Sequence, residues 1–325
     1  MRQEDMRMDK RKIWLLARKY ATLLILIILL IAMAFLTDRF FTLKNLTNVG
    51  RQISLNAFIT IGMTLVIISG GIDLSVGGVC ALSCCMCAKL VNETGNVYLA
   101  IAVTLLLGIA VGFFNGFIVS ATGIAPFIVT LSTVSITNGI TLVATNASPT
   151  PINNAVLKRI GQGVFIGIPI PIYIMVVMAL LAAFIMTKTK FGRYIYAIGG
   201  NEKSAIVAGI RVPTVKLLVY IISGFLSAFT AVIYTGRLSS GVPSLGDGFE
   251  MDAITSAVIG GASLSGGQGG IWGTLIGAVI IGILDNALNL LNINSYFQEI
   301  VTGTVVLLAV LFDFFIQSRI ASKDR

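Results

Sequence analysis

The sequence of 325 residues contains no histidine, which excludes histidine-based acid–base catalysis, histidine metal ligation and histidine pH switches. Charged residues are also scarce, at 11% of the chain, while apolar residues make up 56% and the mean hydropathy is +0.94. This balance is typical of a polytopic membrane protein and not of a soluble domain. The formal charge of +9 does not indicate a nucleic-acid partner, because the cations lie in loops and at the termini, as membrane topology requires.

A phosphate-binding loop of the pattern G-x-x-x-x-G-K-[ST] is missing as well, so the chain is not expected to bind ATP in the usual way. Residues 264–268 nevertheless spell LSGGQ, the signature pentapeptide of ABC transporter ATPase subunits. Because glycine pairs flank it between two apolar runs, we interpret it as a flexible turn and the match as chance. No nucleophile or metal constellation supports a membrane-embedded enzyme. We predict a chain that is not an enzyme and requires no cofactor.

Cysteine is confined to one apolar run, as Cys80, Cys84, Cys85 and Cys87. Cys80 and Cys84 share a helix face, so a soft-metal site is conceivable. Without histidine or a second cysteine cluster, packing by small polarizable side chains is the preferred interpretation. We therefore predict no metal site and no disulfide within this helix.

Hydrophobic runs are abundant, and ten of them have, or approach, the length and apolar content of membrane spans. They cover residues 20–36, 53–69, 74–91, 97–121, 125–143, 170–187, 214–235, 251–261, 271–291 and 297–316. The first resembles a signal sequence, but we favour an uncleaved span because its apolar run is long for a signal peptide. The eighth is short and starts beside acidic residues. The sequence predicts an all-α polytopic membrane protein with about ten transmembrane helices.

The cations are distributed unevenly over this arrangement. Seven precede residue 20, six lie between residues 188 and 216, and three follow residue 316, which leaves seven of the 23 for the opposite side. Basic residues near span ends are retained on the cytoplasmic side. Both termini are therefore predicted to be cytoplasmic, and residues 37–52 to form an external connector.

The stretch 188–216 is the one long polar interruption in the second half of the chain. A glycine pair is expected to break the chain there, and Asn201 can then cap a short helix from about residue 202 to 208. Glu202 lies where the helix dipole favours an anion. The candidate functional residues of this segment are Gly199, Gly200, Asn201, Glu202, Lys203, Ala205 and Gly209. The alternative is a folded connector without a partner.

Two glycine-containing turns share the pattern G-G-x-x-L-S-x-G, at residues 70–77 and 260–267. In the predicted topology both lie between a span that enters from outside and one that leaves from inside, which suggests a duplicated unit in parallel orientation. Asp73 can cap the helix that follows the first turn. The candidate residues of these intramembrane turns are Gly70, Gly71, Asp73, Ser75, Gly260, Gly261 and Ser265.

Uncharged amide side chains occur at or near membrane depth. They could contact a neutral polyhydroxylated solute, so they are candidates for the translocation path. Their alternative role is to hydrogen-bond between helices, as polar residues in membrane bundles often do, and the glycine-rich spans favour such close packing. These residues are Asn56, Asn115, Asn138, Asn286 and Asn289.

Three blocks of the sequence carry a family resemblance: GMTLVIISGGIDLSVGG at 62–78, TKFGRYIYAIGGNEKSAIVAGI at 189–210, and the run from EMDAI at 250 to LDNALNLL at 291. Together they resemble the ribose-type permeases, the membrane subunits of monosaccharide ABC importers, in the branched-chain amino acid/monosaccharide permease superfamily. The resemblance extends over residues 40–313. The N-terminal tail and the cysteine cluster lie outside the family pattern.

The resemblance implies a permease dimer, most simply a homodimer, in the plasma membrane of a bacterium. It implies two further partners, a cytoplasmic ATPase and an extracytoplasmic sugar-binding protein. The segment around residues 200–202 is then the coupling helix that docks in the ATPase. The expected organisation is a cytoplasmic N-terminal tail 1–19, a transmembrane permease domain 20–316 with the cytoplasmic coupling loop 188–216, and a cytoplasmic tail 317–325.

We therefore expect a permease subunit that passes a neutral monosaccharide, a ribose-like pentose or a hexose, when ATP hydrolysis in another chain switches its access. An ion-coupled carrier, relying on Asp285 or Asp73, is the mechanistic alternative. An ABC permease for another small solute, such as an amino acid, is the nearest substrate alternative.

Overall fold

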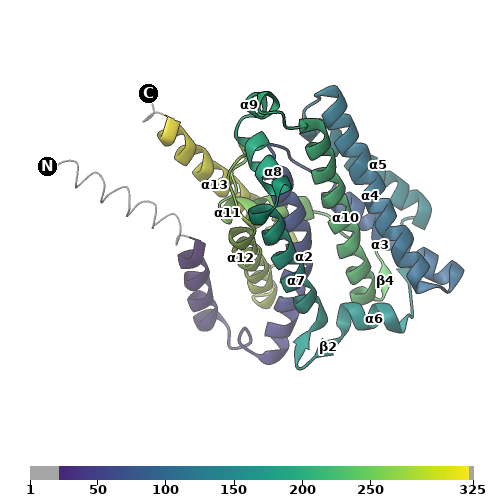
Figure 1. The fold of residues 1–325 in the computed structure, drawn as a ribbon. Coiled ribbons are helices and arrows are strands. Elements are labelled where there is room, and N and C mark those ends of the chain that lie inside the picture. The colour runs from purple at the N-terminus through teal and green to yellow at the C-terminus, as the bar shows by residue number, and fades with distance from the viewer. Residues whose placement is uncertain (1–21, 322–325) are drawn as a thin grey trace.

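The structure is a computed structural model that describes residues 22–321. After a first apolar helix, Thr22–Leu36, helices follow one another with four two-residue strands between them (Figure 1). The elements are α2 Leu43–Ile68, α3 Val76–Thr94, α4 Val97–Thr122, α5 Pro126–Thr145, β1 Thr150–Pro151, α6 Ala155–Gln162, β2 Val164–Phe165, β3 Ile168–Pro169, α7 Ile170–Lys188, α8 Lys190–Gly200, α9 Glu202–Val207, α10 Val212–Leu238, β4 Ser240–Gly241, α11 Phe249–Ile259, α12 Ile271–Leu290 and α13 Ser295–Ala321.

Seven of the described helices are long and apolar enough to cross a membrane, namely α2, α3, α4, α5, α7, α10 and α12. Thr22–Leu36 and the part Tyr296–Leu308 of α13 are shorter apolar helices. The prediction of an all-α polytopic membrane protein is confirmed, whereas the count of ten spans and the sides of the termini stay predictions.

α10 is the central helix of the bundle and packs against α4, α2 and α3. Its Gly224 faces α4, where a β-carbon would lie 3.0 Å from the Cα of Gly112. A β-carbon on Gly112 would in turn lie 2.9 Å from the Cα of Ile221. The backbones of α4 and α10 are therefore in direct contact, as expected where small residues line a helix interface in a membrane.

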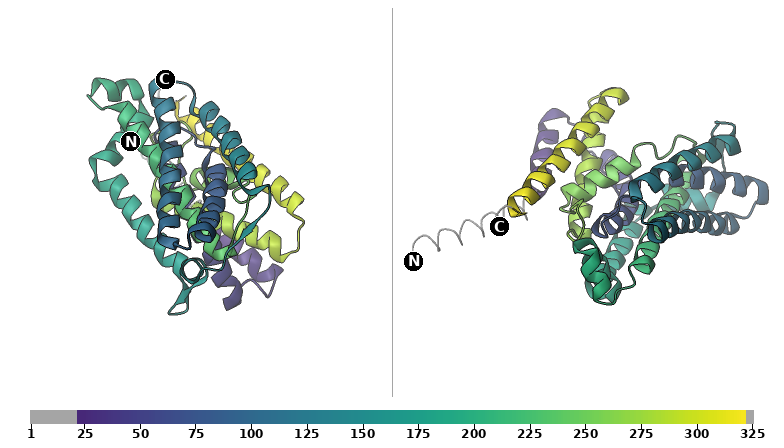
Figure 2. Two further views of the ribbon diagram at one scale, coloured as in Figure 1. Left: turned by 90° about the vertical axis from the view of Figure 1, so that its right-hand side faces the viewer. Right: turned by 90° about the horizontal axis from the view of Figure 1, so that it is seen from above.

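The helix Thr22–Leu36 and α13 lie at one edge of the bundle (purple and yellow, Figure 2). Met33 packs with Val49 and Ile283 of α2 and α12, and α13 packs on α11. At the lower end in Figure 1, β1 pairs antiparallel with β4, and β2 pairs antiparallel with β3 beside α6. These two short strand pairs lie at the end of the bundle opposite to α9 (Figure 1).

Several predicted boundaries were wrong. The second span begins at Leu43, not at residue 53, because Thr42 caps α2 and accepts a hydrogen bond from the backbone amide of Asn45. The predicted connector 37–52 thus shortens to residues 37–42, and its external side stays a prediction. α13 continues to Ala321, and the end of the permease domain at residue 316 also stays a prediction. The predicted tail 1–19 and residues 322–325 lie outside the described residues.

The predicted eighth span, 251–261, is the 11-residue helix α11. At 1.5 Å per residue it is ~16 Å long, about half of the ~30 Å hydrocarbon core. The chain before α11, from β4 to Gly248, is non-helical and runs along α3. A β-carbon on Gly241 would lie 2.9 Å from the Cα of Cys85, and one on Gly246 would collide with the carbonyl of Gly77. The predicted eighth span is therefore only partly helical, and we refer to this segment and α11 together as the broken crossing.

Candidate functional site

The predicted polar loop 188–216 is mostly helical, because α7 extends to Lys188 and α8, α9 and the start of α10 fill the rest. The short predicted helix is α9. The side-chain oxygen of Asn201 accepts a hydrogen bond from the amide of Ser204 at 2.9 Å and so caps it. Gly209, with φ +82°, ends the segment. Ala205 is buried while Lys203 is exposed. One face of α9 therefore packs on the bundle and the other face is exposed.

The prediction that Gly199 and Gly200 break the chain was wrong. They form the last turn of α8. They are instead the place where α8 meets other backbone. A β-carbon on Gly199 would collide with the carbonyl oxygen of Ile68 and lie 2.5 Å from the amide nitrogen of Gly267. A β-carbon on Gly266 would lie 3.1 Å from the Cα of Gly70. The end of α8 therefore packs, backbone against backbone, on both glycine-containing turns.

We call this cluster of Gly70, Gly199, Gly200, Gly266 and Gly267 the glycine junction. Two hydrogen bonds close it. The amide of Gly267 donates to the carbonyl of Ile68 at 2.9 Å, and the hydroxyl of Tyr196 donates to the carbonyl of Gly269 at 2.9 Å. Burial raises the pKa of Tyr196, which keeps its phenol protonated as a donor. The LSGGQ pentapeptide is thus a packed part of the junction and not a flexible turn.

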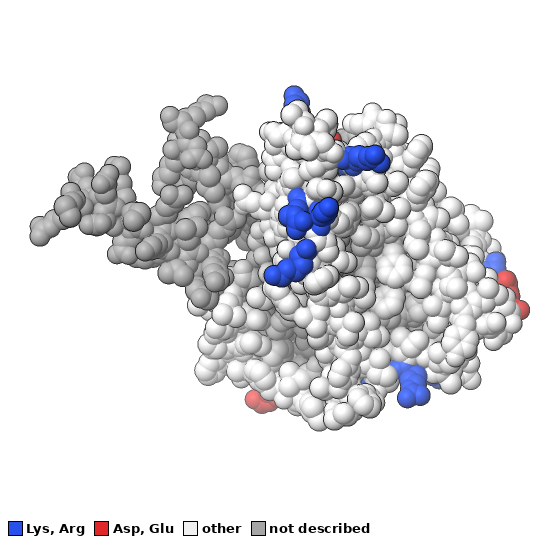
Figure 3. Space-filling model, in the orientation of Figure 1, with Lys and Arg blue, Asp and Glu red and all other residues white. Residues whose placement is uncertain are grey.

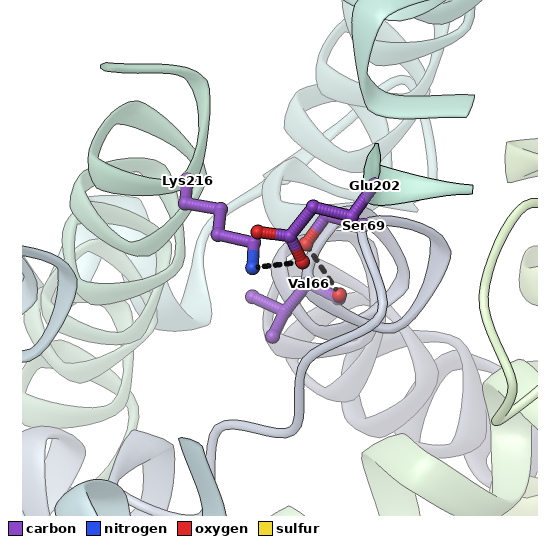
Figure 4. A network of polar contacts seen from close by, with 4 residues as sticks. All are labelled: Val66, Ser69, Glu202 and Lys216. Carbon is purple, nitrogen blue, oxygen red and sulfur yellow. Dashed lines mark hydrogen bonds and ion pairs between the residues drawn. The ribbon is translucent and has the colours of Figure 1, made fainter. Parts of the chain in front are cut away.

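An ion pair holds α9 to α10. The ammonium group of Lys216 donates to a carboxylate oxygen of Glu202 at 2.7 Å (Figure 4). The Lys216 side chain is 19% exposed and that of Glu202 is 48% exposed. Figure 4 shows the pair together with Ser69 and Val66 from the end of α2. The charge of Glu202 is therefore already paired within the chain, which the sequence alone did not reveal.

The remaining charges around α8 and α9 are basic. Lys and Arg side chains gather over the upper part of the molecule near α8 and α9, and again at its lower edge near α6 (Figure 3). The tip of α9 is also apolar, because Ile206 is 57% and Val207 is 89% exposed. A partner for this segment would need an apolar surface with acidic groups around it.

The two predicted turns share their hydrogen bonds but differ in register by one residue. Gly70 and Gly261 both adopt positive φ, at +84° and +92°. In each turn the next residue, Gly71 or Ala262, donates its amide to a carbonyl five residues earlier, the Schellman pattern that ends helices. The sequence motif aligns Gly70 with Gly260, so the predicted equivalence was wrong by one position.

The serine of each motif, Ser75 or Ser265, makes an equivalent hydrogen bond in the register that the motif predicts. The amide of Ser75 donates to the carboxylate of Asp73 at 3.0 Å, and that of Ser265 donates to the hydroxyl of Ser263 at 3.2 Å. The helix α3 begins directly after Ser75, whereas α12 begins only at Ile271. The turns are therefore similar at their start and diverge afterwards, which leaves the internal duplication a prediction.

The prediction that Asp73 caps the helix after the first turn was wrong, because Ser75 is the N-cap residue of α3 and no side chain caps that helix. Asp73 is 1% exposed, and its carboxylate accepts bonds from the hydroxyls of Ser75 at 2.6 Å and Ser223 at 2.7 Å. Ser75 in turn accepts from the amide of Asn115 at 2.8 Å, and the Asn115 carbonyl accepts from the hydroxyl of Thr133 at 2.6 Å. This buried network joins the first turn to α3, α4, α5 and α10.

Of the five asparagines predicted for the translocation path, three bridge elements of the bundle or its loops. Asn115 belongs to the network of Asp73. Asn286 exchanges two amide hydrogen bonds, at 2.9 and 3.0 Å, with Asn45 of α2. Asn289 donates to the backbone of Asp285 and accepts from Gln298. For these three the structure favours the alternative that polar groups connect helices.

The other two asparagines are placed differently. Asn56 is buried within α2. Asn138 lies on α5 and lines a cavity of about 340 Å³. All four cysteines are buried in α3, where Cys84 accepts a bond from Thr235 of α10 at 3.3 Å. Within residues 22–321 no group of three or more acidic or thiol side chains could hold a metal ion.

The long apolar helices, the broken crossing and the basic helical segment between α7 and α10 define this chain as an integral membrane protein of the permease type. It belongs to the family described as branched-chain amino acid transport system / permease component, whose family model matches residues 45–310.

Individual relatives are similar over nearly the whole chain. The ribose import permease protein RbsC of Haemophilus influenzae is 46% identical over 292 residues, covering 89% of this chain and 90% of the relative. RbsC of Bacillus subtilis is 42% identical over 317 residues, covering 96% and 98%. The L-arabinose transport system permease protein AraH of Escherichia coli is 35% identical over 295 residues, covering 91% and 90%. No solved structure matches.

Proposed function

We propose that this chain is the membrane-spanning permease subunit of an ATP-driven sugar importer, with a neutral monosaccharide such as a ribose-like pentose or a hexose as its cargo. The observation that carries the proposal is the similarity, along almost the full length, to proteins named as ribose import permeases. Relatives named for D-allose and L-arabinose transport support monosaccharides as the substrate class. The chain works in a bacterial cell membrane.

ATP binding and hydrolysis take place in a separate cytoplasmic ATPase chain. The exposed basic segment around α9 is the proposed docking element, and its apolar tip and surrounding cations suit a groove with acidic edges. A sugar-binding protein delivers the monosaccharide at the opposite end, near α6 and the two short strand pairs. A second permease copy completes the pathway, most simply as a homodimer.

The glycine junction suggests how the switch is transmitted. ATPase closure moves α9, and α8 moves with it because Asn201 alone separates the two helices. The end of α8 contacts the α2–α3 turn and the α11–α12 turn without intervening side chains. Direct backbone contact leaves little room for compression, so a shift of α8 displaces both turns and the helices attached to them. The result is a change between outward and inward access.

Uptake of radiolabelled ribose by cells that express this chain with its ATPase and binding protein tests the proposal. Uptake should stop when ATP is depleted and continue when an uncoupler removes the ion gradients. Uptake that survives ATP depletion and collapses with the uncoupler would favour the ion-coupled carrier. Competition by amino acids, but not by monosaccharides, would move the substrate to the amino-acid class.

A further inference from the structure

The broken crossing places non-helical backbone beside α3, between Cys85 and Gly77. Gly246 and Gly248 adopt φ values of +95° and +83°, so the segment turns where residues with a β-carbon would be strained. Irregular backbone at membrane depth persists only where it is buried in protein or lines a water-filled cavity. Four residues of this segment line the cavity of about 340 Å³.

This cavity lies between the segment and the end of α5. Its polar groups are the amide of Asn138, the hydroxyl of Ser244 and the carboxylate of Asp247, and its apolar walls include Leu142, Pro149 and Pro243. A β-carbon on Gly78 would lie 3.2 Å from the amide oxygen of Asn138. The glycine at the start of α3 therefore makes room for the Asn138 side chain.

The lining suits an uncharged, polyhydroxylated ring. Amide, hydroxyl and carboxylate groups offer both donors and acceptors to sugar hydroxyls, and the apolar walls can pack on the C–H faces of the ring. The volume is at the lower end of the range of about 300–1,000 Å³ for small-molecule sites. Neither ion pair found within the described residues involves Asp247, and Glu250 lies three residues further along the chain. These carboxylates disfavour an anionic sugar phosphate.

We infer that the cavity between the broken crossing and α5 is a transit site for the monosaccharide, in which Asn138, Ser244 and Asp247 contact the sugar. This inference rests on the proposed function and gives it a location. It also assigns the specificity for neutral over phosphorylated sugars to the carboxylate of Asp247.

Thiol labelling tests the site. The four native cysteines are at most 1% exposed, so a cysteine introduced at an accessible position dominates labelling by a charged, membrane-impermeant reagent. Ser244→Cys is the test variant. Leu106→Cys is the matched control, because Leu106 is 62% exposed on α4 but its helix is apolar, with a mean hydropathy of 2.5, and is expected to face lipid.

In the assembled complex, Ser244→Cys should react roughly tenfold faster than Leu106→Cys, because thiolates form in water and not in hydrocarbon. Excess ribose should slow the labelling of Ser244→Cys severalfold, and ribose 5-phosphate should not. Ser244→Trp should abolish ribose uptake while the amount of assembled complex in the membrane remains near the parent value. Leu106→Trp should transport like the parent.

Equal labelling rates at the two positions, or normal uptake by Ser244→Trp, would overturn the inference. Fast labelling that ribose leaves unchanged would show a wet cavity that is not a sugar site, and would overturn it as well. The proposed function fails separately, through the parent complex. If the parent imports no monosaccharide while the two labelling rates still differ, the cavity stands and the substrate class does not.

Discussion

At the scale of single residues, the least expected finding is the number of hydrogen bonds that the buried carboxylate of Asp73 accepts. Neither ion pair found within the part of the chain that the structure describes involves Asp73, yet its carboxylate accepts bonds from two hydroxyls and one amide. Such a network is stable only when its members are satisfied. The network thus supports the role of Asp73 as a structural tie and weakens its role in an ion-coupled carrier.

Replacing Asp73 should lower the stability of the folded chain. Asp73→Ala removes the acceptor of three bonds, each worth a net ~0.5–1.5 kcal/mol, and leaves their donors buried. Asp73→Asn keeps one acceptor oxygen and should be milder. Thermal unfolding of the purified chain in detergent should rank the parent first, Asp73→Asn second and Asp73→Ala last. If Asp73→Ala unfolds at the parent's temperature, the network is unimportant for the fold.

The ion pair between Glu202 and Lys216 gives a charge-exchange test. Glu202→Lys should impair ribose uptake, because two cations then oppose each other and a cation occupies the N-terminal turn of α9, where the dipole disfavours it. An exposed pair is worth only about 0–1 kcal/mol, so insertion into the membrane should be unaffected.

The double variant Glu202→Lys with Lys216→Glu restores the pair in reverse. If the pair acts by holding α9 on α10, this double variant should recover most of the uptake lost in Glu202→Lys. If Glu202 instead contacts the ATPase directly, the double variant should remain as defective as the single one. Uptake normalised to the assembled complex distinguishes these results.

At the scale of elements, the two turns are the places where backbone conformation is most restricted. Gly71→Leu should impair transport because a β-carbon there would lie 2.6 Å from the hydroxyl oxygen of Tyr220, which is buried. Gly261→Leu should impair it for another reason, since φ at Gly261 is +92° and leucine is strained there.

Gly95→Leu is the control for both turn variants. Like Gly261, Gly95 has positive φ, at +67°, and a β-carbon at either position would meet nothing within 4 Å. Gly95→Leu therefore introduces backbone strain similar to that of Gly261→Leu, but in a loop outside the bundle. We expect this variant to transport like the parent. Transport at the parent rate by both turn variants would remove the turns from the mechanism.

At the scale of the whole molecule, the sequence was sufficient for what depends on local pattern. Hydropathy located the apolar helices, and Asn201 with Gly209 correctly bounded the short helix α9. Sequence reasoning failed where two residues that contact each other are far apart in the chain. Nothing local shows that Gly199 packs on Ile68 and Gly267, that Lys216 pairs with Glu202, or that the eighth crossing is half helix. The pair Gly199 and Gly200 was interpreted as a break in the chain, whereas glycine at position 199 allows the backbone of α8 to approach that of Ile68 and Gly267.

The absence of a phosphate-binding loop leads to a prediction for the purified chain, which should neither bind nor hydrolyse ATP. Its LSGGQ segment contributes the backbone of Gly266 and Gly267 to the glycine junction. Gln268→Ala should therefore leave the ATPase rate of the assembled complex within a few-fold of the parent. Saturable ATP binding by this chain alone, or complete loss of hydrolysis in the Gln268→Ala complex, would be incompatible with this assignment.

The central claim is that motion passes from α9 to the two turns through the glycine junction, and two adjacent residues test it most directly. A β-carbon on Gly199 would collide with the backbone of Ile68, whereas one on Gly200 would meet nothing within 4 Å. The measurement is the number of ribose molecules imported per ATP hydrolysed by the reconstituted complex. Gly199→Ala should lower this ratio severalfold, and Gly200→Ala should keep the parent ratio. Equal ratios for Gly199→Ala and the parent would contradict the claim.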